Sequence, residues 1–152
     1  MKISQILKKE SIVDDLKATT KHGIIRELSE AVAPTARIPA EDIAAVLMER
    51  ESLGSTGIGG GIAIPHGKLN AMTDIILGFG RSRAGVEYDS LDGRPVHIFF
   101  LLLTPENSTG GHLKVLAQIS KLLKMEHFKQ ELKTAETIED IYDLILEQDE
   151  PF

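Results

Sequence analysis

The sequence predicts an α/β fold in which helices cover both faces of one central sheet. Segments with helical apolar spacing alternate along the chain with short apolar runs that suit strands. The run from Pro95 to Leu103, PVHIFFLLL, is apolar at nearly every position, as expected for a strand buried on both faces. With 152 residues, 42% of them apolar and 26% charged, the chain can bury one ordinary core. It contains no repeat or linker, so residues 1–152 are expected to form a single domain.

The first elements are short, and a long helix follows them. Residues 2–9 fit one helical turn, and residues 11–16 fit a short strand. Apolar residues at helical spacing predict a helix over residues 20–33, capped by one of the two threonines at its start. Pro34 is expected to end this helix, because the residue before a proline disfavours the helical conformation.

A second helix is expected to begin after Pro39 and to run to about Glu51. Proline near the first turn and two acidic residues just behind it are helix start signals. The glycine-rich residues 54–68 come next and are expected to form a loop. Within this stretch residues 62–64 suit a short strand, and a polar connection begins at Lys68.

Two more strands are predicted at residues 73–81 and 95–103. The segment 81–92 between them is rich in turn residues and suits a small hairpin or an edge strand. A loop is expected over residues 104–111, where proline, asparagine and two glycines occur.

The C-terminal third is expected to be helical. One helix begins near His112 and ends near Met125, and a separate short helix covers residues 126–132. Thr137 stands three residues before an aspartate, a spacing that resembles a capping box and opens the last helix. Residues 148–152 are expected to form a loose tail.

Composition excludes several classes of function. The net charge is −6 and there is no run of basic residues, which argues against generic nucleic-acid binding. The absence of cysteine excludes disulfides, thiolate metal sites and a cysteine nucleophile. No signal segment and no apolar run of membrane-spanning length is present, so the sequence predicts a cytoplasmic protein without direct membrane insertion.

The stretch GSTGIGGGIAIPHGK, residues 54–68, is the candidate site of chemistry. Six of its fifteen residues are glycine, which suggests that the bare backbone there approaches a ligand, and a phosphate group is the expected one. The glycine spacing does not fit a dinucleotide fingerprint, and no Gly-Lys-Ser/Thr of a P-loop occurs. His66 lies between Pro65 and Gly67, and an imidazole held there could present one nitrogen outward while the other donates to a carbonyl.

Two other residues are candidates for the same site. Arg50 stands in the last turn of its helix, where it either complements the helix dipole or serves as a phosphate ligand. His112 begins a helix, where free N–H groups favour anions, although a partly exposed helix-start histidine is an equal alternative. A zinc site formed by His66, His97 and His112 lacks any diagnostic ligand spacing.

Together these residues resemble a known family. The blocks Arg50–Gly59, Gly61–Lys68 and His112–Ser120 closely resemble the signature of the fructose/mannitol-type IIA proteins of the bacterial phosphoenolpyruvate:sugar phosphotransferase system (PTS). The resemblance implies a central mixed β-sheet sandwiched between α-helices. It also implies that His66 is phosphorylated, that His112 supports the phosphoryl group and that Arg50 lies at the edge of the site. It implies an HPr/NPr-like phosphocarrier protein as donor, and no metal or cofactor.

Within this resemblance two roles compete. A nitrogen-regulatory IIA protein is a terminal phosphate acceptor that controls target proteins, whereas a sugar-uptake IIA protein passes the phosphate to a IIB domain. The runs Leu53–Thr56 and His66–Leu69 look more like the regulatory branch. A third class, a binding module that no longer accepts phosphate, is disfavoured because all three candidate residues are present. An apolar rim is expected around the site, formed by Leu53, Ile58 and Ile64.

Overall fold

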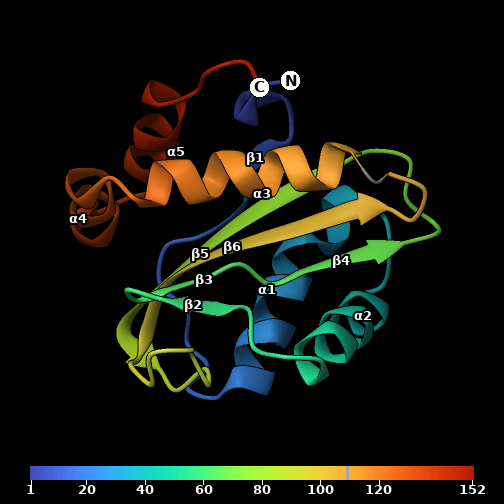
Figure 1. Ribbon diagram of the computed structural model, residues 1–152, viewed down its shortest axis with the longest axis horizontal. Helices are drawn as coiled ribbons and strands as arrows, with labels where there is room; N and C mark the ends of the chain where they lie inside the picture. The colour runs from blue at the N-terminus through green and yellow to red at the C-terminus, as the bar shows by residue number, and fades with distance from the viewer. Residues whose placement is uncertain (109) are drawn as a thin grey trace.

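A six-stranded mixed sheet forms the centre of the computed structural model, which describes residues 1–108 and 110–152 (Figure 1). Five strands follow in the order β1-β5-β6-β3-β2, and β4 pairs with β6 alongside β3. The β1–β5, β3–β6 and β4–β6 pairs are parallel, whereas the β5–β6 and β2–β3 pairs are antiparallel. The strands are β1 (Leu7–Val13), β2 (Gly57–Gly59), β3 (Ile62–Ala63), β4 (His66–Leu69), β5 (Ile76–Val86) and β6 (Val96–Pro105).

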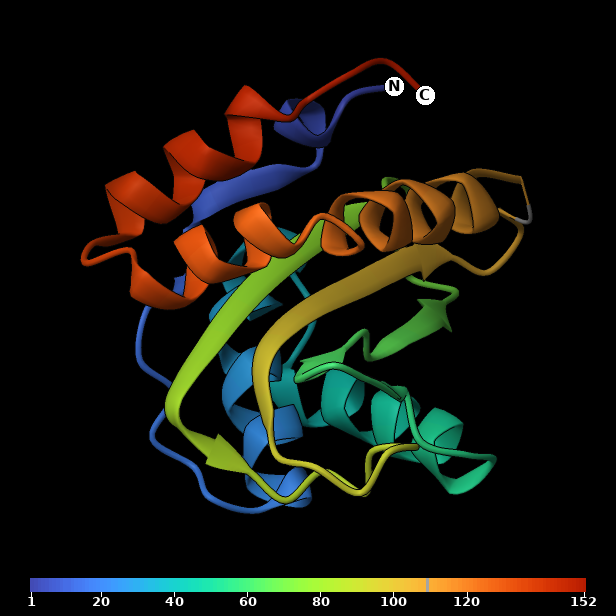
Figure 2. The same cartoon turned by 60° about the vertical axis from the view of Figure 1, so that its left-hand side comes forward.

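Helices cover both faces of this sheet, which confirms the predicted sandwich (Figures 1 and 2). One core lies between the sheet and α3, α4 and α5, and a second lies between the sheet and α1 and α2. The central strand β6 serves both, because Ile98, Phe100 and Leu102 enter the first core and the residues between them enter the second. The helices are α1 (Lys21–Ala36), α2 (Ala40–Ser52), α3 (Gly110–Leu123), α4 (Glu126–Thr134) and α5 (Ile138–Glu147).

Two helix starts follow the sequence signals closely. The Thr20 hydroxyl accepts a hydrogen bond from the Gly23 N–H at 3.1 Å, and Thr137 does the same for Asp140 at 3.0 Å. Each bond satisfies one of the N–H groups that a helix start leaves without an internal partner.

The prediction that Pro34 ends the first helix is wrong. Pro34 lies inside the last turn of α1, where its missing N–H costs a single bond, and the helix continues until Arg37 at φ 57°.

The predicted strand boundaries are wrong at three places. A single 3₁₀ turn, Ile3–Gln5, is followed by β1, which already begins at Leu7. The sequence pattern does not reveal this start, because exposed charged residues fill most of the first half of this edge strand. β5 extends through the predicted turn region as far as Val86. β4 replaces the polar connection that was expected at Lys68. The expected loop over residues 104–111 is shorter than predicted on both sides, since β6 ends at Pro105 and α3 begins at Gly110; Thr109 lies outside the described residues.

The glycine-rich stretch is partly a strand pair rather than a loop. β2 and β3 form a hairpin whose turn carries Gly59, Gly60 and Gly61, with φ angles of 99°, 68° and 80°. Only glycine adopts such values readily, so the glycine run is required by the turn. β3 pairs with the first half of β6 and β4 with the second half. The break between them, at Ile64-Pro65, places His66 beside Leu102 of the central strand β6.

The two ends of the chain meet (Figure 2). The Phe152 N–H donates to the Met1 oxygen at 2.8 Å, and the Asp149 carboxylate accepts the N–H groups of Ile3 and Ser4 at 2.7 and 3.0 Å. The expectation of a loose tail over residues 148–152 is therefore wrong, because these bonds tie the tail to the start of the chain. Among the described residues, no helix is long and apolar enough to cross a membrane.

Candidate functional site

His66 is the first residue of β4, and its imidazole has a defined tautomer. The ring Nδ1 lies 2.7 Å from the carbonyl oxygen of Ile64. A carbonyl can only accept, so Nδ1 carries the proton and the Nε2 of the neutral ring carries a lone pair. Behind the ring, Gly67 leaves space for α2, since a Cβ at this position would lie 2.7 Å from a methyl carbon of Val46. The bond to Ile64 thus fixes the orientation of the imidazole, and Gly67 lets the backbone of β4 pack closely against α2.

His112 lies against His66, as the sequence resemblance implied. The two ring centroids are 5.2 Å apart, and the ring planes are tilted by 56°. His112 belongs to the first turn of α3, where backbone N–H groups lack helical acceptors and favour an anion. Its Nδ1 is buried and has no hydrogen-bond partner among the described residues. This nitrogen therefore has an unused hydrogen-bonding capacity on a ring that lies beside His66.

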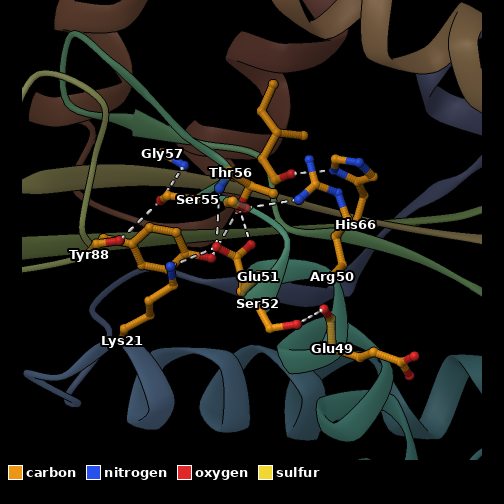
Figure 3. A network of polar contacts seen from close by, with 12 residues as sticks. Lys21, Glu49, Arg50, Glu51, Ser52, Ser55, Thr56, Gly57, His66 and Tyr88 are labelled. Carbon is orange, nitrogen blue, oxygen red and sulfur yellow. Dashed lines mark hydrogen bonds and ion pairs between the residues drawn. The ribbon is translucent and has the colours of Figure 1, made fainter.

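Arg50 approaches the pair from the last turn of α2. Its Nη1 donates to the carbonyl oxygen of Gly54 at 2.8 Å, so the side chain bridges the helix end and the glycine-rich segment. Figure 3 shows the guanidinium beside the His66 ring. Its positive charge is one of the causes that lower the pKa of His66. The structure thus brings Arg50, His66 and His112 together.

Burial lowers the pKa of both site histidines. For His66 the main cause is the loss of hydration, and Arg50 adds to it, while the bond to Ile64 and the charge of Glu51 act in the opposite direction. For His112 burial is again the largest cause, followed by the charges of His66 and Lys68. Both rings are therefore neutral at pH 7, since the usual pKa of histidine is already near 6.5.

Lys68 is a cation of this site that the sequence analysis missed. In β4 the buried Gly67 and Leu69 alternate with His66 and the exposed Lys68, so the latter two share one face of the strand. A glycine takes the place of an apolar residue in this alternation because α2 packs directly onto it. Because this buried position is a glycine, the alternation of apolar and polar residues that is typical of a strand is absent from the sequence here.

The buried carboxylate of Glu51, in the last turn of α2, supports the site through hydrogen bonds, and the sequence analysis missed it too. The side chain of Glu51 is 2% exposed and forms an ion pair with Lys21 at 2.9 Å. It also accepts the N–H of Thr56 at 3.0 Å and a short bond from the hydroxyl of the same residue. Because that hydroxyl proton is used, the 3.2 Å contact between Thr56 and Tyr88 requires the Tyr88 O–H as donor (Figure 3). Burial and the charge of Glu51 raise the pKa of Tyr88.

This network reaches His66 through the backbone. Glu51 holds the Thr56 N–H, the Thr56 carbonyl accepts the Ile64 N–H at 3.0 Å, and the Ile64 carbonyl accepts the His66 Nδ1–H at 2.7 Å. Glu51 thereby supports the segment after β3 that carries the acceptor for His66. A signal existed in the sequence: a glutamate in the last turn of a helix opposes the helix dipole, which suggests a specific cationic partner.

The prediction that Ile64 belongs to an exposed apolar rim is wrong, whereas the other two residues of the predicted rim are exposed. Leu53 is 82% exposed and Ile58 is 48% exposed, but Ile64 is 5% exposed and belongs to the core. Ile64 faces inward and packs in the core between the sheet and α3, α4 and α5. Leu113, next to His112, is 65% exposed.

The remaining histidines lie elsewhere. His97 is at the start of β6, where its Nδ1 donates to the Ser82 carbonyl at 2.9 Å. The described residues include no cluster of three histidine, cysteine or acidic side chains that could hold a metal ion. His22 and His127 lie on exposed helix surfaces.

Comparison with known proteins agrees with this architecture. The nitrogen regulatory protein of Bradyrhizobium diazoefficiens is 35% identical over 145 residues, which is 95% of each protein. The fructose-specific EIIABC component of Bacillus subtilis is also 35% identical, over 98% of this chain, but the chain spans only 24% of that protein's length. The chain therefore corresponds to a whole relative in one case and to one part of a longer protein in the other.

Solved structures give the same picture. The nitrogen regulatory protein IIA-Ntr from Neisseria meningitidis superposes with a TM-score of 0.89 at 34% identity, covering 94% of this chain and 98% of the other. The IIA mannitol protein of Escherichia coli shares the fold, with a TM-score of 0.77 at 22% identity. Residues 5–148 match the family model described as "Phosphoenolpyruvate-dependent sugar phosphotransferase system, EIIA 2". The chain therefore belongs to the EIIA 2 family of the phosphoenolpyruvate-dependent sugar phosphotransferase system.

Proposed function

We propose that this chain accepts a phosphoryl group on His66 from an HPr/NPr-like phosphocarrier protein and acts mainly as a regulator of other proteins. One observation carries the proposal. The His66 Nδ1–H donates to the Ile64 carbonyl at 2.7 Å, which leaves the Nε2 lone pair as the nucleophile. The lowered pKa of His66 keeps this lone pair unprotonated at pH 7.

The transfer is a displacement at phosphorus between two imidazoles. The Nε2 lone pair of His66 forms a new P–N bond while the P–N bond to the carrier's histidine breaks, and the bonding electrons leave with the carrier's nitrogen. Such a reaction needs in-line positioning and stabilisation of the three equatorial phosphoryl oxygens, with little covalent help from the protein. No metal or cofactor takes part in this scheme.

Four groups are available to stabilise the phosphoryl oxygens. His112 lies 5.2 Å from His66 between ring centroids and has an unpartnered, buried nitrogen. Arg50 and Lys68 contribute positive charge near the ring pair, since Arg50 lowers the pKa of His66 and Lys68 lowers the pKa of His112. The first N–H groups of α3 add donors at the same place.

Exposed leucines beside the site suit the docking of a carrier protein. Leu53 follows Arg50 at the end of α2, and Leu113 follows His112, and both are more exposed than apolar residues of this size usually are. We expect Leu53→Ser and Leu113→Ser to raise the KM for the phosphocarrier while the fold is retained. An unchanged KM in both variants would remove these residues from the docking surface.

The regulatory role is favoured by the relatives, and sugar uptake is the second candidate. The nitrogen regulatory proteins of Bradyrhizobium diazoefficiens and Pseudomonas aeruginosa are 35% and 34% identical to this chain, over 95% and 96% of their own length. The fructose-specific relatives are nearly as similar, at 35% and 33% identity. A mannitol-type relative has been solved in complex with phosphorylated enzyme IIB, so onward transfer to a IIB domain is the feature that distinguishes uptake.

One assay tests both the transfer and the role. The protein is incubated with labelled phosphoenolpyruvate, enzyme I and a phosphocarrier, and the labelled residue is identified. Acid-labile phosphate on His66, lost in His66→Ala but retained in the matched variant His97→Ala, supports phosphotransfer. Absence of label on the wild-type protein contradicts it. Addition of IIB proteins then separates the roles, because passage of the label to a IIB protein and a sugar supports uptake.

A further inference from the structure

A second group of cationic side chains lines a cavity that the phosphotransfer reaction does not use. The cavity measures about 350 Å³ and lies between the irregular part of β5, the start of β6 and the end of α4. Three of its five lining residues carry a positive charge at pH 7, in a chain whose net charge is −6. The lining residues are Arg81, Ser82, Arg83, His97 and Lys133.

The cavity is distinct from the phosphoryl site. His66 pairs with Leu102 on β6, five residues after His97. At about 3.3 Å per residue this corresponds to roughly 17 Å along the strand. The β2–β3 hairpin lies between the two sites. Ile64, which follows the hairpin, accepts the hydrogen bond from His66, whereas Gly61 in the hairpin turn lies against His97 and Lys133 of the cavity.

Arg81 is buried at the floor of this cavity and has no counter-ion among the described residues. Its side chain is 1% exposed, and its three hydrogen bonds all go to backbone carbonyls, those of Asp14, Leu132 and Ala135. The Nη2 group is buried and has no acceptor among the described residues. No ion pair within 4.0 Å involves Arg81 in the described part of the chain. A buried charge of this kind is costly, and an anion above it would stabilise it.

The other cationic groups are also available. Lys133 forms no ion pair within the described part of the chain, whereas Lys129, one turn earlier on α4, is paired with Glu126 at 2.7 Å. The Lys133 Nζ and the His97 Cδ2 lie 3.9 and 4.0 Å from the position that a Cβ on Gly61 would occupy, so both side chains lie against the hairpin turn. The dipole of α4 accounts for a cation at Lys133, in its last turn, but not for two arginines beside it.

Nearby acidic groups do not neutralise the cluster by contact. Asp14 and Asp15 lie close enough to raise the pKa of Arg81 slightly, although burial lowers that pKa more strongly. The carboxylate of Asp15 is engaged with Lys17 at 2.9 Å. The Asp14 contact with Arg81 is through its backbone oxygen, not its carboxylate. The cluster therefore retains a net positive charge toward the cavity.

We infer that this cavity binds a small phosphorylated metabolite. Guanidinium and ammonium groups together with the Ser82 hydroxyl are the donors that recognise a phosphate dianion. A volume of about 350 Å³ is at the lower end of the range of small-molecule sites, roughly 300–1,000 Å³, and suits a phosphate ester with a few carbon atoms. The His97 ring, fixed by its bond to Ser82, forms one wall.

Chemical-shift titration of the full-length protein tests this inference. Inorganic phosphate and glycerol phosphate serve as probes, with potassium chloride at equal ionic strength as control. We expect saturable shifts of the Ser82, Gly85 and His97 amides with both phosphates and none with chloride. Lys133→Ala should weaken binding about tenfold, the loss expected for one charge-assisted hydrogen bond. Lys124→Ala, an exposed lysine between α3 and α4, should bind as the wild type does.

Three outcomes would overturn the inference. Shifts that increase linearly with concentration would indicate screening rather than a site. Shifts confined to His66 and His112 would assign phosphate binding to the phosphoryl site alone. Equal affinity of Lys133→Ala and Lys124→Ala would remove the cavity from binding. Arg83→Ala gives an independent check on the cavity, since Arg83 is exposed, whereas replacing Arg81 would also release the end of α4.

Discussion

Replacement of Glu51 by glutamine tests whether the buried carboxylate supports the site. The change keeps the size and one acceptor oxygen but removes the charge and places an NH₂ group against donors. Glu51 accepts from the Lys21 ammonium, the Thr56 N–H and the Thr56 hydroxyl, and its side chain is only 2% exposed. Solvent screening is therefore small on the carboxylate side, although Lys21 is partly exposed.

The expected loss of stability follows from these contacts. Hydrogen bonds to a charged group contribute about 1.5–3 kcal/mol and neutral ones about 0.5–1.5 kcal/mol, so a loss of about 1 kcal/mol per contact gives about 3 kcal/mol for Glu51→Gln. Breaking a buried ion pair from one side typically costs a similar amount. For a chain of this size such a loss lowers Tm by about 6–12 °C.

Urea denaturation followed by circular dichroism measures this change, because the chain has no tryptophan for fluorescence. Glu49→Gln is the matched control, since Glu49 is exposed on the same helix and should change stability by less than about 0.5 kcal/mol. If the two variants are equally stable, the network does not hold the site. The same Glu51→Gln variant should also lower the pKa of His66, because the charge of Glu51 raises it.

Three further predictions concern the site itself. His112→Ala should slow phosphorylation of His66 on the order of 10²-fold, which is the effect of losing one oxyanion-type donor. The control His127→Ala, at an exposed histidine, should leave the rate unchanged. An equal rate in both variants would exclude His112 from the mechanism. Because burial holds the pKa of His66 below 6.5, phosphoryl acceptance should be constant above that pH and fall as the pH drops through the lowered pKa, and an NMR titration with a midpoint at or above 6.5 would refute this. Gly67→Ala should lower the free energy of unfolding in urea by about 1–3 kcal/mol, because its Cβ would lie 2.7 Å from Val46. Adding Val46→Ala should restore much of the lost stability. No recovery in the double variant would show that this contact is not the cause.

The fold class was predictable from sequence because the central strand and the main helices have strong apolar patterns. β6 is apolar on both faces and lies at the middle of the sheet, where both cores meet. The weaker elements were missed where packing replaced pattern. In β4 a glycine occupies a buried position because α2 lies against it, so the alternation of apolar residues is absent. In α1 a proline is tolerated because it falls in the last turn, which a pattern of single residues does not reveal.

The site was predictable to the extent that it lies in contiguous motifs. Arg50, His66 and His112 occur in three sequence blocks that resemble one family, and the structure brings the three residues together. Glu51 and Lys68 are adjacent to these residues but act through contacts with Lys21, Thr56 and the neighbouring ring, which no local pattern encodes. The cavity near Arg81 depends on the meeting of β5, β6 and α4, which are far apart in sequence.

The position of the phosphate on the His66 ring tests the central claim most directly. The hydrogen bond from Nδ1 to the Ile64 carbonyl leaves only Nε2 free to react. After phosphorylation by enzyme I and a phosphocarrier, NMR of the ring nitrogens should show phosphorus coupled to Nε2 and a retained Nδ1–H of His66. Phosphate on Nδ1, or on a residue other than His66, would contradict the account.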